Sequence, residues 1–142
     1  MTPYSSIPIG EILPQQPPFR FVDSFENYTE DGAVVAFTPQ RGKQLLMEDG
    51  HLSAAGLVEH MAQASAARVG YVSKYILHIP VSIGFIGQVR KLIINRLPRE
   101  GERIETEVLI RQEVFKITLA DIVVRSGSEV LASASLKSAL PE

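Results

Sequence analysis

The 142-residue sequence contains no cysteine, which excludes disulfides, thiolate zinc sites and a cysteine nucleophile. It also lacks an excess of either charge, because 14 Lys and Arg stand against 16 Asp and Glu. This balance gives none of the basic surface that is typical of nucleic-acid binding. No apolar run approaches the roughly 18 residues that a membrane-spanning helix requires, and the N-terminal residues lack the basic and apolar segments of a signal peptide. We therefore expect a cytoplasmic protein with no membrane span and no nucleic-acid partner.

What is present is the composition of one folded domain. Hydrophobic residues make up 45% of the chain and charged residues 21%. At 15.6 kDa the chain is long enough to bury one core and short for two. We find no linker and no internal repeat, and we expect a single domain over residues 1–142.

Hydrophobic periodicity and turn residues predict the order of the elements. A helix is predicted over residues 54–75, because this stretch has no proline and six alanines and follows a suitable N-cap, Ser53. The predicted strands cover residues 19–28, 33–37, 83–95, 103–112, 115–125 and 130–138, with one helical turn at 9–13, an extended proline-rich connector at 14–18 and an irregular loop at 38–50. A hairpin, one long helix and four further strands predict an α+β domain with the helix packed on one face of an antiparallel sheet.

One face of the predicted helix collects small side chains around two polar ones. Its members are Ala55, Gly56, Glu59, Ala62, Gln63, Ala66 and Gly70. Small side chains allow close approach of another backbone, so this face is expected against a sheet or a partner chain, although it is equally typical of an alanine-rich face in water. If it is covered, Glu59 and Gln63, four residues apart, share a confined environment in which a carboxyl group is suited to acid or base chemistry.

The start of the helix has a second feature of interest. Ala54 to Gly56 present unpaired backbone N–H groups where no bulky side chain intrudes. Such groups can donate hydrogen bonds to negative charge that develops on a carbonyl oxygen. Every helix has such an end, so this feature alone does not establish a site.

Four segments of the sequence resemble one family, in the same order along the chain. These are IGEILPQQPPFRFVDSF (9–25), GLVEHMAQASAA (56–67), GFIGQVRKLIINRLPREGERIETEV (84–108) and LASASLKSAL (131–140). The chain resembles the bacterial 3-hydroxyacyl-acyl-carrier-protein dehydratases. Within them it is most similar to the small dehydratase-like proteins of aryl-polyene and flexirubin pigment pathways, which also have a shortened loop before the helix.

The resemblance implies a hot-dog fold, in which a curved antiparallel sheet wraps around one long central helix. It implies a homodimer or larger assembly whose sheets join edge to edge, with acyl tunnels at the interface. The acid of the family falls on Glu59 and the glutamine that follows it on Gln63. The family's thioester carbonyl is polarised by a backbone N–H at the helix start, which here is Ala55 or Gly56.

The sequence departs from the family at its histidines. The family's His-Phe-Pro motif is absent, and its expected position falls near Leu45, while Gln15 stands where the opening pattern has a histidine. His51, in the loop before the helix, is the candidate replacement, although a loop histidine is also commonly a solvated residue. His60 is expected to point about 100° away from Glu59 on the helix, and His78 to lie on the surface. Histidines so scattered do not predict a metal site.

The resemblance implies elimination of water from a 3-hydroxyacyl thioester, giving a trans-2-enoyl thioester. His51 is assigned as the base, Glu59 as the acid and Gln63 as the group that orients Glu59. No metal or organic cofactor is expected. The resemblance also implies that the substrate is carried on the phosphopantetheine of an acyl-carrier protein. The acyl chain is expected to contact Phe85, Ile86, Val89 and Ala62, residues that are equally compatible with a plain core. Contacts with the acidic carrier are predicted at Arg90 and Lys91, with Arg68 and Arg96 as further candidates.

Two alternatives remain open at this point. A hot-dog thioesterase would use the same carboxyl group to activate water. A non-catalytic acyl-thioester-binding subunit, the silent partner of a catalytic chain, would explain the loss of the motif histidine. Fold analogy alone does not decide among the three.

Overall fold

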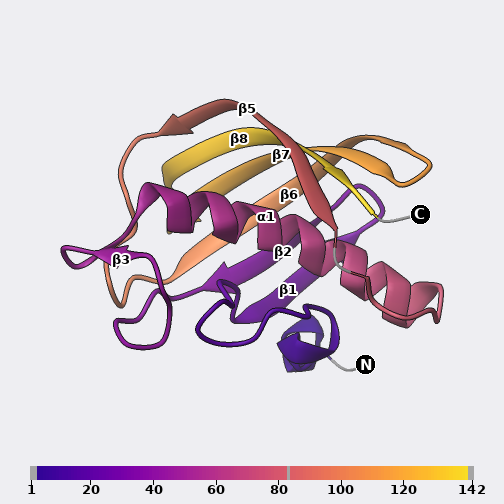
Figure 1. Cartoon of the computed structure of the whole chain (residues 1–142), viewed down its shortest axis with the longest axis horizontal. Coiled ribbons are helices and arrows are strands. Elements are labelled where there is room, and N and C mark those ends of the chain that lie inside the picture. Colours follow the sequence, from indigo (N-terminus) through magenta and orange to yellow (C-terminus); the bar gives the residue numbers. More distant parts are fainter. Residues whose placement is uncertain (1–2, 83, 141–142) are drawn as a thin grey trace.

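The computed structural model describes residues 3–82 and 84–140. A curved six-stranded antiparallel sheet has the strand order β1-β2-β6-β7-β8-β5, and one long helix lies across its face (Figure 1). The strands are β1 (Ser24–Thr29), β2 (Gly32–Phe37), β5 (Phe85–Ile94), β6 (Ile104–Val114), β7 (Ile117–Ser126) and β8 (Glu129–Ala139). This arrangement agrees with the α+β architecture that the sequence predicts.

The long helix α1 (Ala54–Tyr71) begins where the sequence predicts. Ser53 is its N-cap, and the Ser53 hydroxyl oxygen accepts a hydrogen bond of 3.1 Å from the backbone N–H of Gly56. The chain stays helical to Ile76, one residue beyond the predicted end, with Val72–Ile76 as a π-helix. The described chain contains no helix that is long and apolar enough to cross a membrane.

The helix packs on only part of the inner face of the sheet. It contacts β2, β6 and β7, and its buried side chains Leu57, Met61, Ala64 and Ala67 belong to the main core. The edge strand β5 pairs with β8 alone. The described side chains of β5 up to Ile93 are exposed, so the β8–β5 end of the sheet lacks cover within this protomer.

The N-terminal region differs from its prediction. The first strand begins at Ser24 rather than at residue 19, because the segment before it is held by a side chain of α1 instead of a neighbouring strand: the backbone N–H of Phe21 donates to Gln63 Oε1 at 2.7 Å. Two short 3₁₀ helices precede it, Tyr4–Ser6 and Ile9–Glu11. The loop at 38–50 is irregular as predicted, except that β3 (Met47–Glu48) pairs with β4 (His51–Leu52) in a small hairpin.

The remaining strands follow their predictions within a few residues. Strand β5 starts at Phe85, while Ile83, the predicted start, lies outside the described residues. The β6–β7 and β7–β8 connections are tight, and Gly127 in the second has a φ of +58°, a backbone conformation that glycine adopts readily.

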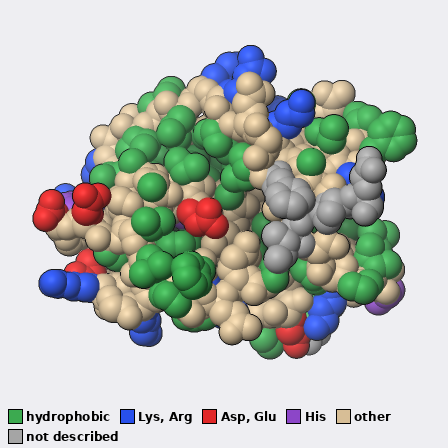
Figure 2. Space-filling view, in the orientation of Figure 1, with side chains coloured by type: hydrophobic (Ala, Val, Ile, Leu, Met, Phe, Trp, Pro, Cys, Tyr) green, Lys and Arg blue, Asp and Glu red, His purple; other side chains and the backbone are tan. Residues whose placement is uncertain are grey.

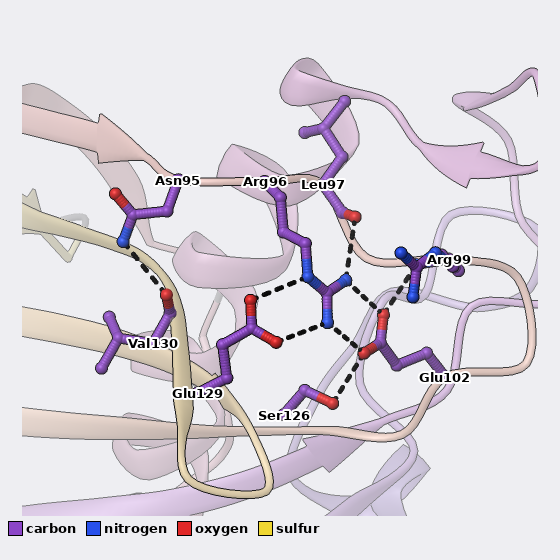
Figure 3. A network of polar contacts seen from close by, with 8 residues as sticks. All are labelled: Asn95, Arg96, Leu97, Arg99, Glu102, Ser126, Glu129 and Val130. Carbon is purple, nitrogen blue, oxygen red and sulfur yellow. Dashed lines mark hydrogen bonds and ion pairs between the residues drawn. The ribbon is translucent and has the colours of Figure 1, made fainter.

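An ionic network joins the β5–β6 connection to the β7–β8 turn (Figure 3). Arg96 Nη2 lies 2.6 Å from Glu102 Oε2, and Arg96 Nε lies 2.9 Å from Glu129 Oε2. Glu102 also accepts hydrogen bonds from the Ser126 hydroxyl and from the backbone N–H of Arg99. The guanidinium of Arg96 holds the pKa of the Glu102 carboxyl well below its usual range. The network ties two loops that are distant in sequence at one end of the sheet.

Candidate functional site

A cavity of about 340 Å³ lies between α1 and the β8–β5 end of the sheet. The helix contributes Glu59, Ala62, Gln63 and Ala66 to its wall, and the proline-rich connector contributes Pro14 and Gln15. The sheet side includes Ile86, Thr118, Leu136 and Ser138. Small helix residues leave this space open, because alanine side chains cannot fill it.

Glu59 is the one acidic residue of α1. The face seen in the space-filling view is mostly hydrophobic and uncharged near its centre, with charged side chains mainly toward its edges (Figure 2). Glu59 is half-buried in the isolated protomer and borders the cavity. The structure thus places a half-buried carboxyl group on the wall of a cavity whose other residues are small, apolar or polar, with Lys116 as the other charged residue among those described.

Gln63 holds the Glu59 carboxylate in place. Its Nε2 donates to Glu59 Oε1 at 2.9 Å and to the carbonyl oxygen of Phe19 at 2.8 Å. Its Oε1 accepts from the N–H of Phe21. The amide is buried, with 1% of its residue surface exposed. Since every polar atom of this side chain is engaged, its orientation is set, and that orientation directs an N–H toward the carboxylate.

The small-residue stripe of the helix has two different environments. Gly56, Gln63 and Gly70 are buried, whereas Ala62 and Ala66 are half-exposed along the cavity. At Gly70 the covering group is the N-terminal segment, not a sheet or a partner, because a Cβ there would lie 1.8 Å from the Ile12 carbonyl oxygen. The prediction of a closely covered face is therefore right at Gly70, but the covering element is a different one.

The three histidines all lie away from the cavity within this protomer. His51, on β4, has its Nδ1 3.0 Å from the Asp49 carbonyl oxygen and is not among the described residues that border the cavity. His78 is exposed after the π-helix. Glu59 therefore has no imidazole beside it in the described part of its own chain, and the assignment of His51 as base stays a prediction.

His60 points into the core, as its helical position predicts. Its Nδ1 lies 2.6 Å from the Phe21 carbonyl oxygen and its Nε2 lies 2.7 Å from the Thr106 hydroxyl. The ring stacks on Phe37 with ring centroids 5.2 Å apart. Burial lowers the pKa of His60 to about 4. A neutral imidazole with both nitrogens engaged is a structural group here.

The predicted oxyanion donors lie one turn before the carboxyl group. The N–H of Gly56 already donates to the Ser53 hydroxyl, and Gly56 packs closely against Leu52. Ala55 is exposed. Neither residue borders the described cavity, so their role as donors also stays a prediction.

Of the predicted acyl-contact residues, the structure brings Ala62 and Ile86 to the cavity. Val89 lies further along β5 and is 37% exposed. The side chain of Phe85 lies outside the described part of the structure.

The predicted carrier contacts separate into two groups. Arg90 and Lys91 are exposed on β5 and border a shallow cavity of about 200 Å³ together with Asp121. Arg68 is wrong as a surface contact, because it is buried and its guanidinium donates to the carbonyl oxygens of residues 29, 30 and 32. The guanidinium of Arg96 is already paired with the carboxylates of Glu102 and Glu129.

Sequence reasoning missed the cavity's other polar residues. Gln15 borders the cavity, and its side-chain oxygen is buried without a hydrogen-bond partner among the described residues. Thr118 and Ser138 line it from the sheet. Only Gln15 carried a sequence signal, as the residue that replaces a family histidine. Thr118 and Ser138 lie on strands with ordinary alternation, and the sequence did not indicate that their hydroxyl groups face a cavity.

Comparisons with known proteins agree with this geometry. A model of the ApeP-like family, described as ApeP dehydratase, matches residues 7–142. No curated protein matches the sequence. Among solved structures, the dehydratase heterocomplex ApeI:P from Xenorhabdus doucetiae superimposes with a TM-score of 0.86 at 19% identity, covering 96% of this chain and 92% of that chain.

Two other similar structures have the same fold at lower identity. The PaaI protein from the phenylacetic acid degradation operon of E. coli gives a TM-score of 0.62 at 15% identity, covering 81% of this chain and 80% of that one. A hypothetical thioesterase with coenzyme A from Streptococcus pneumoniae gives a TM-score of 0.65 at 11% identity, covering 83% and 84%. The fold is the hot-dog fold that the sequence resemblance implies.

Proposed function

The chain belongs to the ApeP-like dehydratase family, and from that premise we propose that it takes part in removing water from a 3-hydroxyacyl thioester carried on acyl-carrier protein. The observation that carries the proposal is the Glu59 carboxyl group on the wall of the cavity, held by a fully engaged Gln63. A carboxyl group so placed can transfer a proton to a substrate group that enters the cavity.

In the proposed reaction a base removes the proton on the carbon next to the thioester carbonyl. The C–O bond to the 3-hydroxyl then breaks, and the hydroxyl leaves as water with a proton from Glu59. The electron pair of the broken C–H bond becomes the new double bond. A hydrogen-bond donor near the helix start, at Ala55 or Gly56, would stabilise the enolate oxygen. No metal or organic cofactor is assigned a step.

Within the described part of one protomer, no side chain beside Glu59 is suited to act as the base of this reaction. His51, His60 and His78 are all placed elsewhere in the described chain. We therefore propose that the complete site forms with a second subunit. That subunit is either another copy, whose His51 approaches Glu59, or a related dehydratase chain that brings its own imidazole.

The uncovered β5 edge supports assembly through this strand. It is ten residues long and pairs on one side only, and Ile86, Val89 and Ile93 on it are 41%, 37% and 56% exposed. A long exposed edge with apolar side chains is normally covered in a stable protein. A second subunit that pairs with β5 would cover this edge and lie next to the cavity, which Ile86 also borders.

The acyl-carrier protein is proposed as the substrate's carrier, with Arg90 and Lys91 as its contacts. Both are exposed cations suited to an acidic partner. Because both also lie on β5, the Arg90→Ala and Lys91→Ala variants must be tested for assembly and for carrier binding separately.

One assay tests the reaction and separates the alternatives. The purified chain, and the chain mixed with a second dehydratase subunit, are incubated with a 3-hydroxyacyl carrier-protein substrate, and enoyl absorbance and free thiol are followed. Enoyl product from the chain alone supports a complete site between two copies. Product only with the second subunit supports a half-site. Thiol release supports the thioesterase alternative, and no product with retained substrate binding supports a silent subunit.

The Glu59→Gln variant tests the acid. It preserves shape and removes the transferable proton, so turnover is expected to fall at least about a hundredfold with the fold intact. Glu107→Gln, at an exposed position of β6 that borders none of the described cavities, is the matched control and should leave turnover unchanged. Wild-type activity in Glu59→Gln would show that Glu59 is not the acid.

A further inference from the structure

A second cavity of about 350 Å³ lies toward the other end of α1, next to the β6–β7 hairpin. It shares Val69, Lys116, Thr118 and Leu140 with the cavity that holds Glu59. The two cavities are therefore adjacent, and these four side chains lie between them. Val69 comes from the helix, Thr118 from β7, and Leu140 follows β8.

The helix provides a continuous line from the carboxyl group to this partition. Glu59, Ala62, Ala66 and Val69 follow one another at spacings of three, four and three residues, so they lie on one stripe. Val69 lies about 15 Å along the helix from Glu59. Between Glu59 and Val69 this stripe carries only the alanines Ala62 and Ala66. Val69 is the first residue on it with a branched side chain.

The second cavity has an apolar part and a polar part. Tyr28, Leu77, Ile79 and Phe115 form the apolar part, which is suited to the end of an acyl chain, whereas Glu30, Glu113 and Lys116 lie in the polar part. Arg68 also borders it, but its guanidinium donates hydrogen bonds to three backbone carbonyls and stacks over the Tyr28 ring at 5.1 Å. Since these contacts already engage the cation, Arg68 does not mark an anion site.

We propose that the two cavities are consecutive parts of one path for the acyl chain, with Val69 as the residue that limits chain length. The proposal rests on the proposed function, because it takes the thioester to lie at Glu59. A chain that only reaches Val69 fills the first cavity. A longer chain passes Val69 and Leu140 and buries its end against Tyr28 and Leu77.

The test measures binding, so it does not depend on turnover. Saturated acyl-pantetheine thioesters of increasing chain length are titrated into the full-length protein by calorimetry. In the wild type, affinity is expected to keep rising by up to about fourfold per added methylene beyond the length that fills the first cavity. In Val69→Phe the rise stops at the shorter length, because the larger ring occupies the passage.

Two further variants make the result specific. Val69→Leu, a milder change, is expected to weaken binding of long chains to a smaller extent, and Val69→Ala to leave it intact. Val123→Phe is the matched control, since Val123 lies on β7 and borders neither cavity. Thermal unfolding of each variant shows that it is folded.

The failures of the two proposals give different results. If short thioesters bind and Val69→Phe leaves the dependence on chain length unchanged, the path past Val69 is wrong and the proposed function stands. If wild-type affinity stops rising at the first-cavity length, the same conclusion follows. The titration is repeated with the chain mixed with a second dehydratase subunit, because the complete site is proposed to form with one. If no thioester binds in either case, the path past Val69 is overturned, and the enoyl assay decides separately whether the proposed function stands.

Discussion

The side-chain nitrogen of Gln63 donates to the carboxylate of Glu59 and to the carbonyl oxygen of Phe19, 44 residues earlier in the chain. One amide therefore couples a helix residue to the segment that precedes β1. Because Gln63 Oε1 also accepts from Phe21, the carboxylate is oriented by the packing of the N-terminal region. Substitutions in the N-terminal region are therefore expected to alter the orientation of the Glu59 carboxylate even where they do not contact it.

Replacement of Gln63 by leucine tests this coupling. The variant leaves the buried N–H of Phe21 without its acceptor, so the free energy of unfolding should fall by about 1–3 kcal/mol. Turnover should fall by about tenfold to a hundredfold, because Glu59 loses its fixed orientation. Urea unfolding and enoyl formation measure the two effects. Gln112→Leu, on the exposed part of β6, should change neither, and an active, fully stable Gln63→Leu would contradict the coupling.

The buried His60 predicts how stability depends on pH. Its pKa is lowered from 6.5 to about 4, chiefly by burial. As the pH falls through 6.5 the unfolded chain binds a proton that the folded chain does not bind until about pH 4. The free energy of unfolding should therefore be highest above pH 6.5 and fall between pH 6.5 and 4, by up to about 3 kcal/mol.

Urea unfolding at a series of pH values measures this slope. In His60→Gln, which has no titrating group, the contribution of His60 in that window should disappear, so the variant is less stable than the wild type above pH 6.5 and the difference narrows toward pH 4. An identical slope in the two proteins would assign the pH dependence to other groups.

The contact between Gly70 and Ile12 predicts a large effect from one methyl group. A Cβ at Gly70 would lie 1.8 Å from the Ile12 carbonyl oxygen, so the backbone of one segment must move. Gly70→Ala should destabilise the protein by at least about 1–3 kcal/mol, despite the better helix propensity of alanine. In Gly87→Ala the added carbon meets its nearest atom at 3.7 Å, and thermal unfolding should show a much smaller change.

The ionic network at Arg96 predicts a contrast between two glutamates. Glu102 accepts from Arg96, Ser126 and the Arg99 backbone, and its side chain is 17% exposed. Glu102→Gln should therefore cost about 1–3 kcal/mol. Glu105 also pairs with an arginine, Arg103, but both side chains are about half exposed, at 53% and 52%. Glu105→Gln should cost less than about 1 kcal/mol. Equal losses in chemical denaturation would show that the network has no special role.

Much of the fold could be predicted because its signals are local. The start of α1 was found from Ser53 and the alanine-rich stretch after it. The four strands after the helix were found from alternation and turn residues. The end of the helical segment was found within one residue, but the change from α-helix to π-helix at Val72 was not, because both helix types use the same residues. The first strand was placed too early because Phe19 and Phe21 look like strand residues, although their polar backbone groups bind Gln63.

The sequence by itself determined the order of the elements and placed Glu59 next to Gln63, because strand alternation and helical spacing are set by neighbours in the chain. Tertiary structure decided what surrounds that pair. The segment that fixes Gln63 and the end of the sheet that stays open both depend on residues 40 or so positions apart, such as Gln63 and Phe21 with their separation of 42. Contacts between such residues follow from packing of the whole chain, which no local pattern encodes.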